Sequence, residues 1–185
     1  ATPTSIAASG NLYTLGIGFS GTPNGSEVLT AVPVDNGIYD AAGNEANTTQ
    51  SNNTVTLNDQ LAATISAVVH ASNNATIAVT FAEAVYTTTD ASTALIVGDF
   101  SLTISGGTAT LSSATPSSIS ASGNVYTLGM NISGTPTGFE QITVSPVDNS
   151  IYDATNNEAS TYQVMNQDYL TDKVGPTIGS TAVGA

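Results

Sequence analysis

The sequence contains no cysteine and no tryptophan, and Lys173 is its only lysine or arginine. Without cysteine the chain can form neither disulfides nor thiolate zinc sites, and it has no cysteine nucleophile. No apolar run reaches the eighteen or so residues that predict a membrane-spanning helix. There are only four phenylalanines, so the hydrophobic content of 40% is mostly Ala, Val, Ile and Leu. A core of small side chains, many of them β-branched, favours β-strands.

Charge is equally one-sided, because fourteen acidic residues give a formal net charge of -13. Nucleic acids and anionic membranes are bound through Lys and Arg, so we expect neither nucleic acid nor membrane insertion among the partners. One basic residue cannot pair with so many carboxylates. The carboxylates are therefore solvated, accept hydrogen bonds in turns, or attract cations.

An internal repeat dominates the organisation of the chain. Residues 2–59 align without a gap with residues 115–172, at a constant offset of 113, and 35 of these 58 positions are identical by direct count. The repeat predicts that residues 1–59 are the second half of one repeat, 60–172 a complete repeat, and 173–185 the first strand of another. Either the chain is a window of a longer array, or strands from elsewhere complete its ends.

Within the complete repeat, short segments of alternating polarity lie between turn signals. Such a pattern predicts antiparallel strands, and seven of them in about 113 residues are typical of an immunoglobulin-like sandwich. Residues 82–99 are compatible with a short strand or a helical turn. The predicted fold class is all-β, with tandem immunoglobulin-like seven-stranded antiparallel sandwiches, and the predicted strands are 63–69, 75–81, 100–104, 108–113, 125–132, 141–147 and 160–165.

Three segments carry a resemblance to a known family. Residues 79–85 read VTFAEAV and resemble the "VTFSEPV" strand of bacterial Ig-like repeats, while Asp99-Phe100 resembles the "F-x-L" strand that follows. Residues 151–154 with Asn157 resemble the "I-x-D-x-A-G-N" ending. The resemblance implies an extracellular location on a bacterial surface, in tandem arrays of large adhesins and S-layer-associated proteins, where such repeats act mainly as spacers or display modules.

The sequence departs from this family pattern at two places. Ala82 and Ala84 stand where the family has Ser and Pro, and Thr155-Asn156 replaces the Ala-Gly that the first copy keeps as Ala42-Gly43. Since Asn adopts a left-handed conformation less readily than Gly, the family pattern does not fix the turn geometry of the second copy.

Acidic residues are predicted to gather at one pole of the sandwich if its strands alternate in direction. Ca²⁺ fits such a pole, because it accepts six to eight oxygens in irregular geometry, and it would fix the angle between successive domains. The alternative is that the same carboxylates accept hydrogen bonds in Asx turns or are solvated, as we also expect for Asp90. The candidate calcium ligands are Asp59, Glu83, Asp99, Asp148, Asp153 and Glu158, with Asp35, Asp40, Glu45 and Asp172 from the repeated pattern.

No residue set indicates catalysis, and we expect the chain not to be an enzyme. His70, the only histidine, is predicted to be a solvated turn residue, and no Ser-His-Asp set can be assembled around it. Paired carboxylates could serve a glycosidase, but here they lie on loops with few aromatic residues to stack a sugar. A single lysine, Lys173, excludes a self-formed Lys-Asn cross-link within the complete domain.

Three functions remain after these exclusions. The first is a non-enzymatic extracellular structural repeat, the spacer or stalk of a giant bacterial adhesin or surface fibre. The second is a self-assembling filament or sheath subunit whose incomplete ends are completed by neighbouring subunits. The third is a carbohydrate- or surface-binding module using Tyr13, Tyr39, Tyr126 and Tyr152. Expected partners are neighbouring repeats or identical subunits, with any surface glycan or host ligand bound elsewhere in the full protein.

Overall fold

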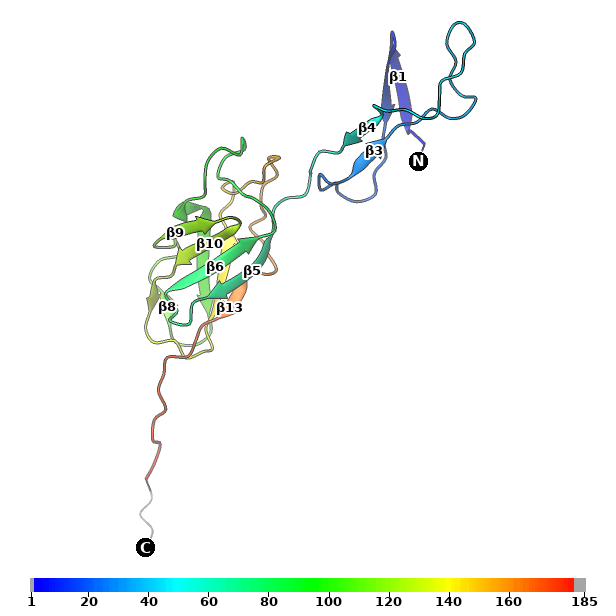
Figure 1. Ribbon diagram of the computed structural model, residues 1–185. Helices are drawn as coiled ribbons and strands as arrows, with labels where there is room; N and C mark the ends of the chain where they lie inside the picture. Colours follow the sequence, from blue (N-terminus) through cyan, green and yellow to red (C-terminus); the bar gives the residue numbers. More distant parts are fainter. Residues whose placement is uncertain (1, 182–185) are drawn as a thin grey trace. The chain divides into compact units, whose positions relative to one another are not determined.

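The computed structural model describes residues 2–181, and antiparallel strands make up nearly all of its regular structure (Figure 1). The chain divides into two compact units, Ala1–Leu61 and Ala62–Ala185. Among the described residues the only helical element is one short 3₁₀ turn, η1 (Val97–Asp99). No described helix has the length and apolar character needed to cross a membrane. The predicted all-β class is therefore confirmed.

The first unit consists of two separate strand pairs. Strand β1 (Ser5–Ser9) pairs with β2 (Leu12–Gly16), and β3 (Val28–Thr30) pairs with β4 (Thr54–Thr56). Most of its described residues are exposed, and the cluster of buried hydrophobic residues that forms the core of the molecule takes no described residue from it.

The second unit contains two larger sheets and one short strand pair. Their order follows the hydrogen bonding between neighbours rather than the order along the chain. One sheet has the order β5 (Ile65–His70), β6 (Thr76–Phe81), β10 (Val125–Gly129), β9 (Ile119–Ser122); the other has β13 (Gln167–Tyr169), β12 (Gln141–Pro146), β7 (Phe100–Ser105); and β8 (Thr110–Leu111) pairs with β11 (Ile132–Ser133).

The inward faces of these two sheets form one core. Every second residue of β6 and of β12 is buried, as the period of two in a strand requires. Phe81 and Tyr126 of one sheet meet Phe100 of the other, with ring centroids of Phe81 and Phe100 6.3 Å apart. The second unit is thus a pair of sheets packed face to face, consistent with a β-sandwich.

The complete unit has its entrance and its exit at opposite ends (Figure 1). The backbone N–H of Ile65 donates to the side chain of Gln163, and that of His70 donates to Asp168. Strand β5 therefore runs alongside residues 163–168 in the same direction. Because β5 begins the unit and β13 ends it, the chain leaves at the end remote from the one where it entered.

Four predicted strands coincide with observed ones to within two residues, namely β5, β6, β7 and β12. The last predicted strand, 160–165, is wrong, and β13 takes its place. Gln163 and Asn166 explain the difference, since both are buried and their amides donate to the carbonyls of Ser160 and Val144, at 2.8 Å each. Amides used in this way hold the segment in a loop.

Smaller corrections concern the middle of the unit. The single strand predicted at 125–132 is divided between β10 and β11, and the strand predicted at 108–113 shrinks to the two residues of β8. Strand β9 was not predicted at all. Residues 82–99 contain η1, together with a bridge between Tyr86 and Tyr152.

The first unit reproduces the second half of the complete one. Strands β1, β2, β3 and β4 occupy the positions of β9, β10, β12 and β13 at the offset of 113. The registers agree as well: Ser9 faces Leu12 as Ser122 faces Val125. Beyond residue 172 the described chain, to residue 181, contains no regular element; residues 182–185 of the predicted third repeat lie outside the described residues.

Candidate functional site

The repeated acidic loop is organised around a buried aspartate. Asp153 is 0% exposed, and its carboxylate accepts the backbone N–H groups of Thr155 and Asn157, both at 2.8 Å, and the side-chain amide of Asn157 at 2.7 Å. Burial would by itself raise the pKa of Asp153, but the hydrogen bonds from Asn157 and Thr155 outweigh it, so the pKa is lowered. Asp153 is thus held as a carboxylate by the turn that it closes.

The first copy folds in the same way although no described residue of its unit belongs to the buried hydrophobic core. Asp40 accepts the backbone N–H groups of Ala42 and Asn44, at 2.9 and 2.8 Å, and the side-chain amide of Asn44 at 2.9 Å. That side-chain bond is the main reason why the pKa of Asp40 is lowered. The loop therefore needs only its own residues to form.

The turn that the sequence left open, with Asn156 in place of Gly43, has the same left-handed residue in both copies. The backbone φ is +88° at Gly43 and +72° at Asn156, both in the left-handed region. Asn is among the few other residues that adopt this region. The glutamate that follows has the same role in both copies: Glu158 accepts the backbone N–H of Asn149, and Glu45 accepts that of Asn36.

Five other candidate calcium ligands also accept hydrogen bonds from nearby groups. Asp99 is 4% exposed and accepts the backbone N–H of Ile96 at 2.7 Å, while its burial raises its pKa. Side-chain amides of the following asparagines bind Asp35 and Asp148. Asp59 and Asp172 each accept a backbone N–H two residues further along, at 2.8 Å. Many of the acidic side chains of the repeated pattern thus serve as hydrogen-bond acceptors in turns.

Only part of the predicted ligand set is brought together by the structure. A carboxylate oxygen of Glu83 lies within 4.8 Å of one of Asp153, at the end where the chain enters the second unit. Asp172 follows β13 at the other end of this unit. The remaining candidates from the repeat, together with Asp59, belong to the first unit: Asp35, Asp40 and Glu45.

A second fully buried acid, Glu140, was missed by the sequence reasoning. It is 0% exposed; its Oε1 accepts the backbone N–H groups of Thr108 and Ala109, at 2.7 and 3.0 Å, and its Oε2 accepts that of Thr137 at 2.8 Å. Burial would raise its pKa, yet these three N–H groups lower it to about 2. The sequence feature that could have identified Glu140 is the repeat itself, because Glu27 stands at the equivalent position 113 residues earlier.

A diglycine turn is shaped to this carboxylate. Gly106 and Gly107 have φ of +78° and +55°, a region that favours glycine. A Cβ on Gly107 would lie 2.0 Å from Oε1 of Glu140, and one on Gly106 would lie 2.4 Å from the carbonyl oxygen of Phe139. Only glycines let the backbone approach closely enough for Thr108 and Ala109 to donate to Glu140.

The prediction of a solvated His70 is wrong. Its Nδ1 lies 2.7 Å from Oδ2 of Asp168, its Nε2 lies 2.9 Å from Oγ1 of Thr171, and its side chain is 15% exposed. The Thr171 hydroxyl, the His70 imidazole and the Asp168 carboxylate thus form a hydrogen-bonded chain that sequence reasoning did not find, because His70 is about a hundred residues from the other two. Burial would raise the pKa of Asp168, but bonds from His70 lower it. The contact joins β5 of one sheet to β13 of the other.

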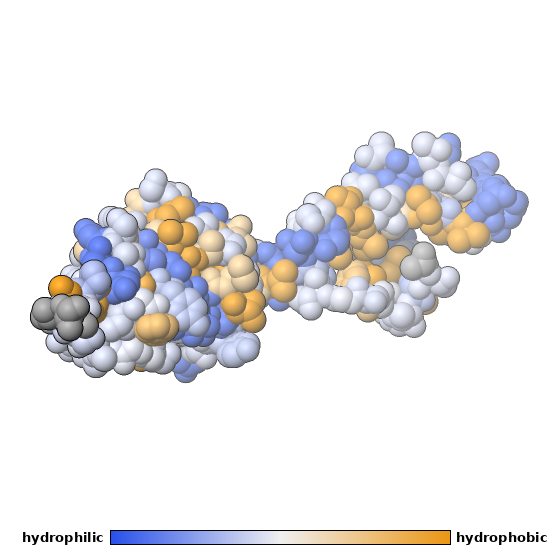
Figure 2. Space-filling model, turned by 90° about the horizontal axis from the view of Figure 1, so that it is seen from below, coloured by the Kyte–Doolittle hydropathy of each residue, from blue (hydrophilic) through white to orange (hydrophobic). Residues whose placement is uncertain are grey.

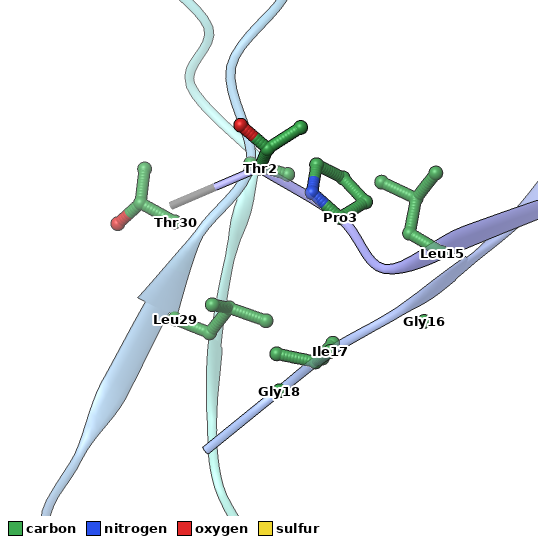
Figure 3. Close-up of a pocket in the computed structure, with 9 residues that line it drawn as sticks. Thr2, Pro3, Leu15, Gly16, Ile17, Gly18, Leu29 and Thr30 are labelled. Atoms are coloured by element: carbon green, nitrogen blue, oxygen red, sulfur yellow. The ribbon is translucent and has the colours of Figure 1, made fainter. Parts of the chain in front are cut away.

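An apolar cleft lies in the first unit (Figure 3). It is lined by Pro3, Leu15, Ile17 and Leu29, and the side chains of Ile17 and Leu29 point toward each other. Leu15 is 39% exposed, whereas its equivalent Leu128 is 0% exposed. Figure 2 shows that hydrophobic residues reach the surface of the molecule.

No protein-family model, curated protein or solved structure matches this chain. Its function is therefore inferred from the repeat and from the contacts described above.

Proposed function

We propose that the chain is a non-enzymatic structural segment, the spacer or stalk of an extended bacterial surface protein built from tandem immunoglobulin-like repeats. The observation that carries this proposal is that the complete unit has its entrance and exit at opposite ends. Repeats with this property, joined at intervals of 113 residues, add length with every copy. The resemblance to bacterial Ig-like repeats supports the same role and an extracellular location.

The contacts between the first and last strands of the second unit suit a role under mechanical tension. Tension applied at the two ends would pull β5 and β13 in opposite directions along their common axis. It would be resisted by the bonds of Ile65 to Gln163 and of His70 to Asp168. Since several such bonds would have to break together, the edge of the unit resists extension better than a strand pair that opens one bond at a time.

Tandem repetition predicts the size of the native polypeptide. We expect mass spectrometry of the protein isolated from its source to show a chain far larger than 18.5 kDa, with peptides that recur at intervals of about 113 residues. A native chain of 18.5 kDa that polymerises would instead support the filament or sheath subunit.

The filament alternative has one observation of its own, the exposed apolar side chains of the first unit, which an identical subunit could cover. The carbohydrate-binding alternative has less support. Tyr13 and Tyr39 are 60% and 53% exposed, but Tyr126, the equivalent of Tyr13, is 6% exposed and donates its hydroxyl hydrogen to the carbonyl of Val85. The repeat thus marks Tyr13 as a core position.

Calcium at the entrance of the complete unit is a second proposal, carried by the close approach of Glu83 and Asp153. Two carboxylates at this distance repel each other, and a divalent cation with oxygen ligands would relieve the repulsion. We expect added calcium to raise the melting temperature relative to EDTA. Glu83→Gln should remove that difference, while Glu27→Gln, an acid outside the candidate ligand set, should keep it; an unchanged melting temperature in the unaltered chain would eliminate the ion.

A further inference from the structure

The apolar residues of the first unit have equivalents in the second unit, where the structure shows which strands cover them. Leu128 on β10 and Ile142 on β12, the counterparts of Leu15 and Leu29, are both 0% exposed. Strand β6 pairs with β10 so that Ile77 faces Leu128, and β7 pairs with β12 so that Ile104 faces Ile142. Residues 62–114 therefore supply the strands that bury this half of the complete unit.

One polar group of the first unit, the Glu27 carboxylate, matches the acceptor that binds the same covering segment in the second unit. Glu27, the counterpart of Glu140, accepts the backbone N–H of Asn24 at 3.0 Å, as Glu140 accepts that of Thr137. Glu140 also binds two N–H groups of the turn after β7, from Thr108 and Ala109. Glu27 thus stands, with its local bond already formed, where an incoming segment would present the same two donors.

We propose that one face of the first unit, formed by the exposed Leu15, the half-buried Leu29 and the Glu27 carboxylate, is a docking site for a polypeptide segment with the sequence pattern of residues 62–114. Docking would add a strand beside β2 and another beside β3, and it would place the two N–H groups that follow a diglycine turn on Glu27. This inference rests on the proposed function, because a repeat array supplies segments of this kind.

The docking face carries its own selectivity. Strand addition through backbone bonds alone accepts many sequences, whereas Glu27 requires a turn whose backbone can come as close as Gly106 and Gly107 come to Glu140. A segment with alternating apolar residues but a side chain at the second glycine would collide with the carboxylate. The partner is therefore defined by two features together, the alternating strands and the diglycine turn between them.

Binding of a fluorescent peptide with the sequence of residues 62–114 to the full chain tests the proposal. We expect saturable binding that Glu27→Ala weakens about tenfold, the effect of losing about 1.4 kcal/mol, and that Leu15→Asp combined with Leu29→Asp abolishes. Gly107→Val in the peptide should weaken binding to a similar extent. The matched control is Glu45→Ala, an exposed acid of the same unit outside this face, which should leave binding unchanged.

A second format covers a peptide that does not stay soluble. Residues 62–114 are joined ahead of residue 1 by a flexible linker, and hydrogen exchange is measured at the amides of β2 and β3. Exchange should slow in the fused chain and recover when Leu15→Asp and Leu29→Asp are added. Absent protection, or binding that Glu27→Ala leaves intact, would overturn the proposal.

Two further outcomes distinguish failure of the docking proposal from failure of the proposed structural function. Self-association of the full chain that the Leu15→Asp and Leu29→Asp pair abolishes but Glu27→Ala leaves intact would assign the face to apolar contact with a second copy and overturn the proposed occupant. Failure of docking in a protein whose native chain still shows the 113-residue repetition would remove this inference and leave the structural role standing.

Discussion

Glu140→Gln is expected to lower the free energy of unfolding of the second unit by about 3 kcal/mol at neutral pH. The carboxylate is buried and accepts three backbone N–H groups through its two oxygens. Glutamine offers one oxygen and one amide NH₂ group, so at least one of these donors would face another donor with no water to compensate. Urea unfolding followed by circular dichroism measures the loss.

The effect of Glu140→Gln should depend on pH in a defined direction. The pKa of Glu140 falls from its ordinary 4.5 to about 2 in the folded unit. A group with a lowered folded pKa contributes stability that is present above the unfolded pKa and is lost as pH falls toward the folded one. The difference between the two proteins should therefore be full above about pH 5 and shrink between pH 4.5 and 2.

The matched control is Glu27→Gln, the same substitution at the equivalent position of the first unit. Glu27 accepts a local N–H but carries none from a covering turn, so we expect little change in the unfolding of the second unit. An equal loss of stability at pH 7 and pH 3 for Glu140→Gln would show that the loss does not come from its ionised form.

Much of the fold could be predicted because the relevant signals are local or repeated. Strands β6, β7 and β12 alternate apolar and polar residues over six positions, and their predicted bounds differ from the observed ones by one residue. The boundaries of the repeat could be predicted by aligning the chain with itself. Sequence periodicity is reliable where one face of a strand is buried throughout.

The errors arise where polarity does not follow burial. Strand β13 has the sequence Gln-Asp-Tyr, which no hydrophobic pattern marks, and its place at the sheet edge tolerates exposed polar residues. The nearby Tyr162 and Val164 alternate as a strand would, but they are 80% and 76% exposed. The sequence there alternates as a strand would, but the buried side chains of Gln163 and Asn166 bond to backbone carbonyls and hold the segment in a loop.

The candidate site shows the same limit for polar contacts. The turn bonds of Asp153 join residues within four positions, so the alternative of an Asx turn could be stated from sequence. Glu140 meets a turn more than thirty residues away, and His70 meets Asp168 across 98 positions. Long-range polar pairs depend on how the sheets are stacked, which periodicity does not specify.

Leu128→Ala and Leu15→Ala, one leucine at two equivalent positions, should differ sharply in cost. Leu128 of β10 is 0% exposed beside Ile77 of β6, and its truncation leaves a cavity in a packed core. Such substitutions cost about 3 kcal/mol. Leu15 is 39% exposed in a unit that contributes nothing described to the core, so its truncation should cost less than about 1 kcal/mol.

Urea unfolding of the full chain, with hydrogen exchange at the amides of β2 and β10, assigns each loss to its unit. Equal costs for Leu15→Ala and Leu128→Ala would show that the first unit buries its own leucine, which would also remove the reason for a docking face there. Adding residues 62–114 ahead of the first unit should raise the cost of Leu15→Ala toward that of Leu128→Ala. The same side chain then changes from nearly neutral to stabilising according to what covers it.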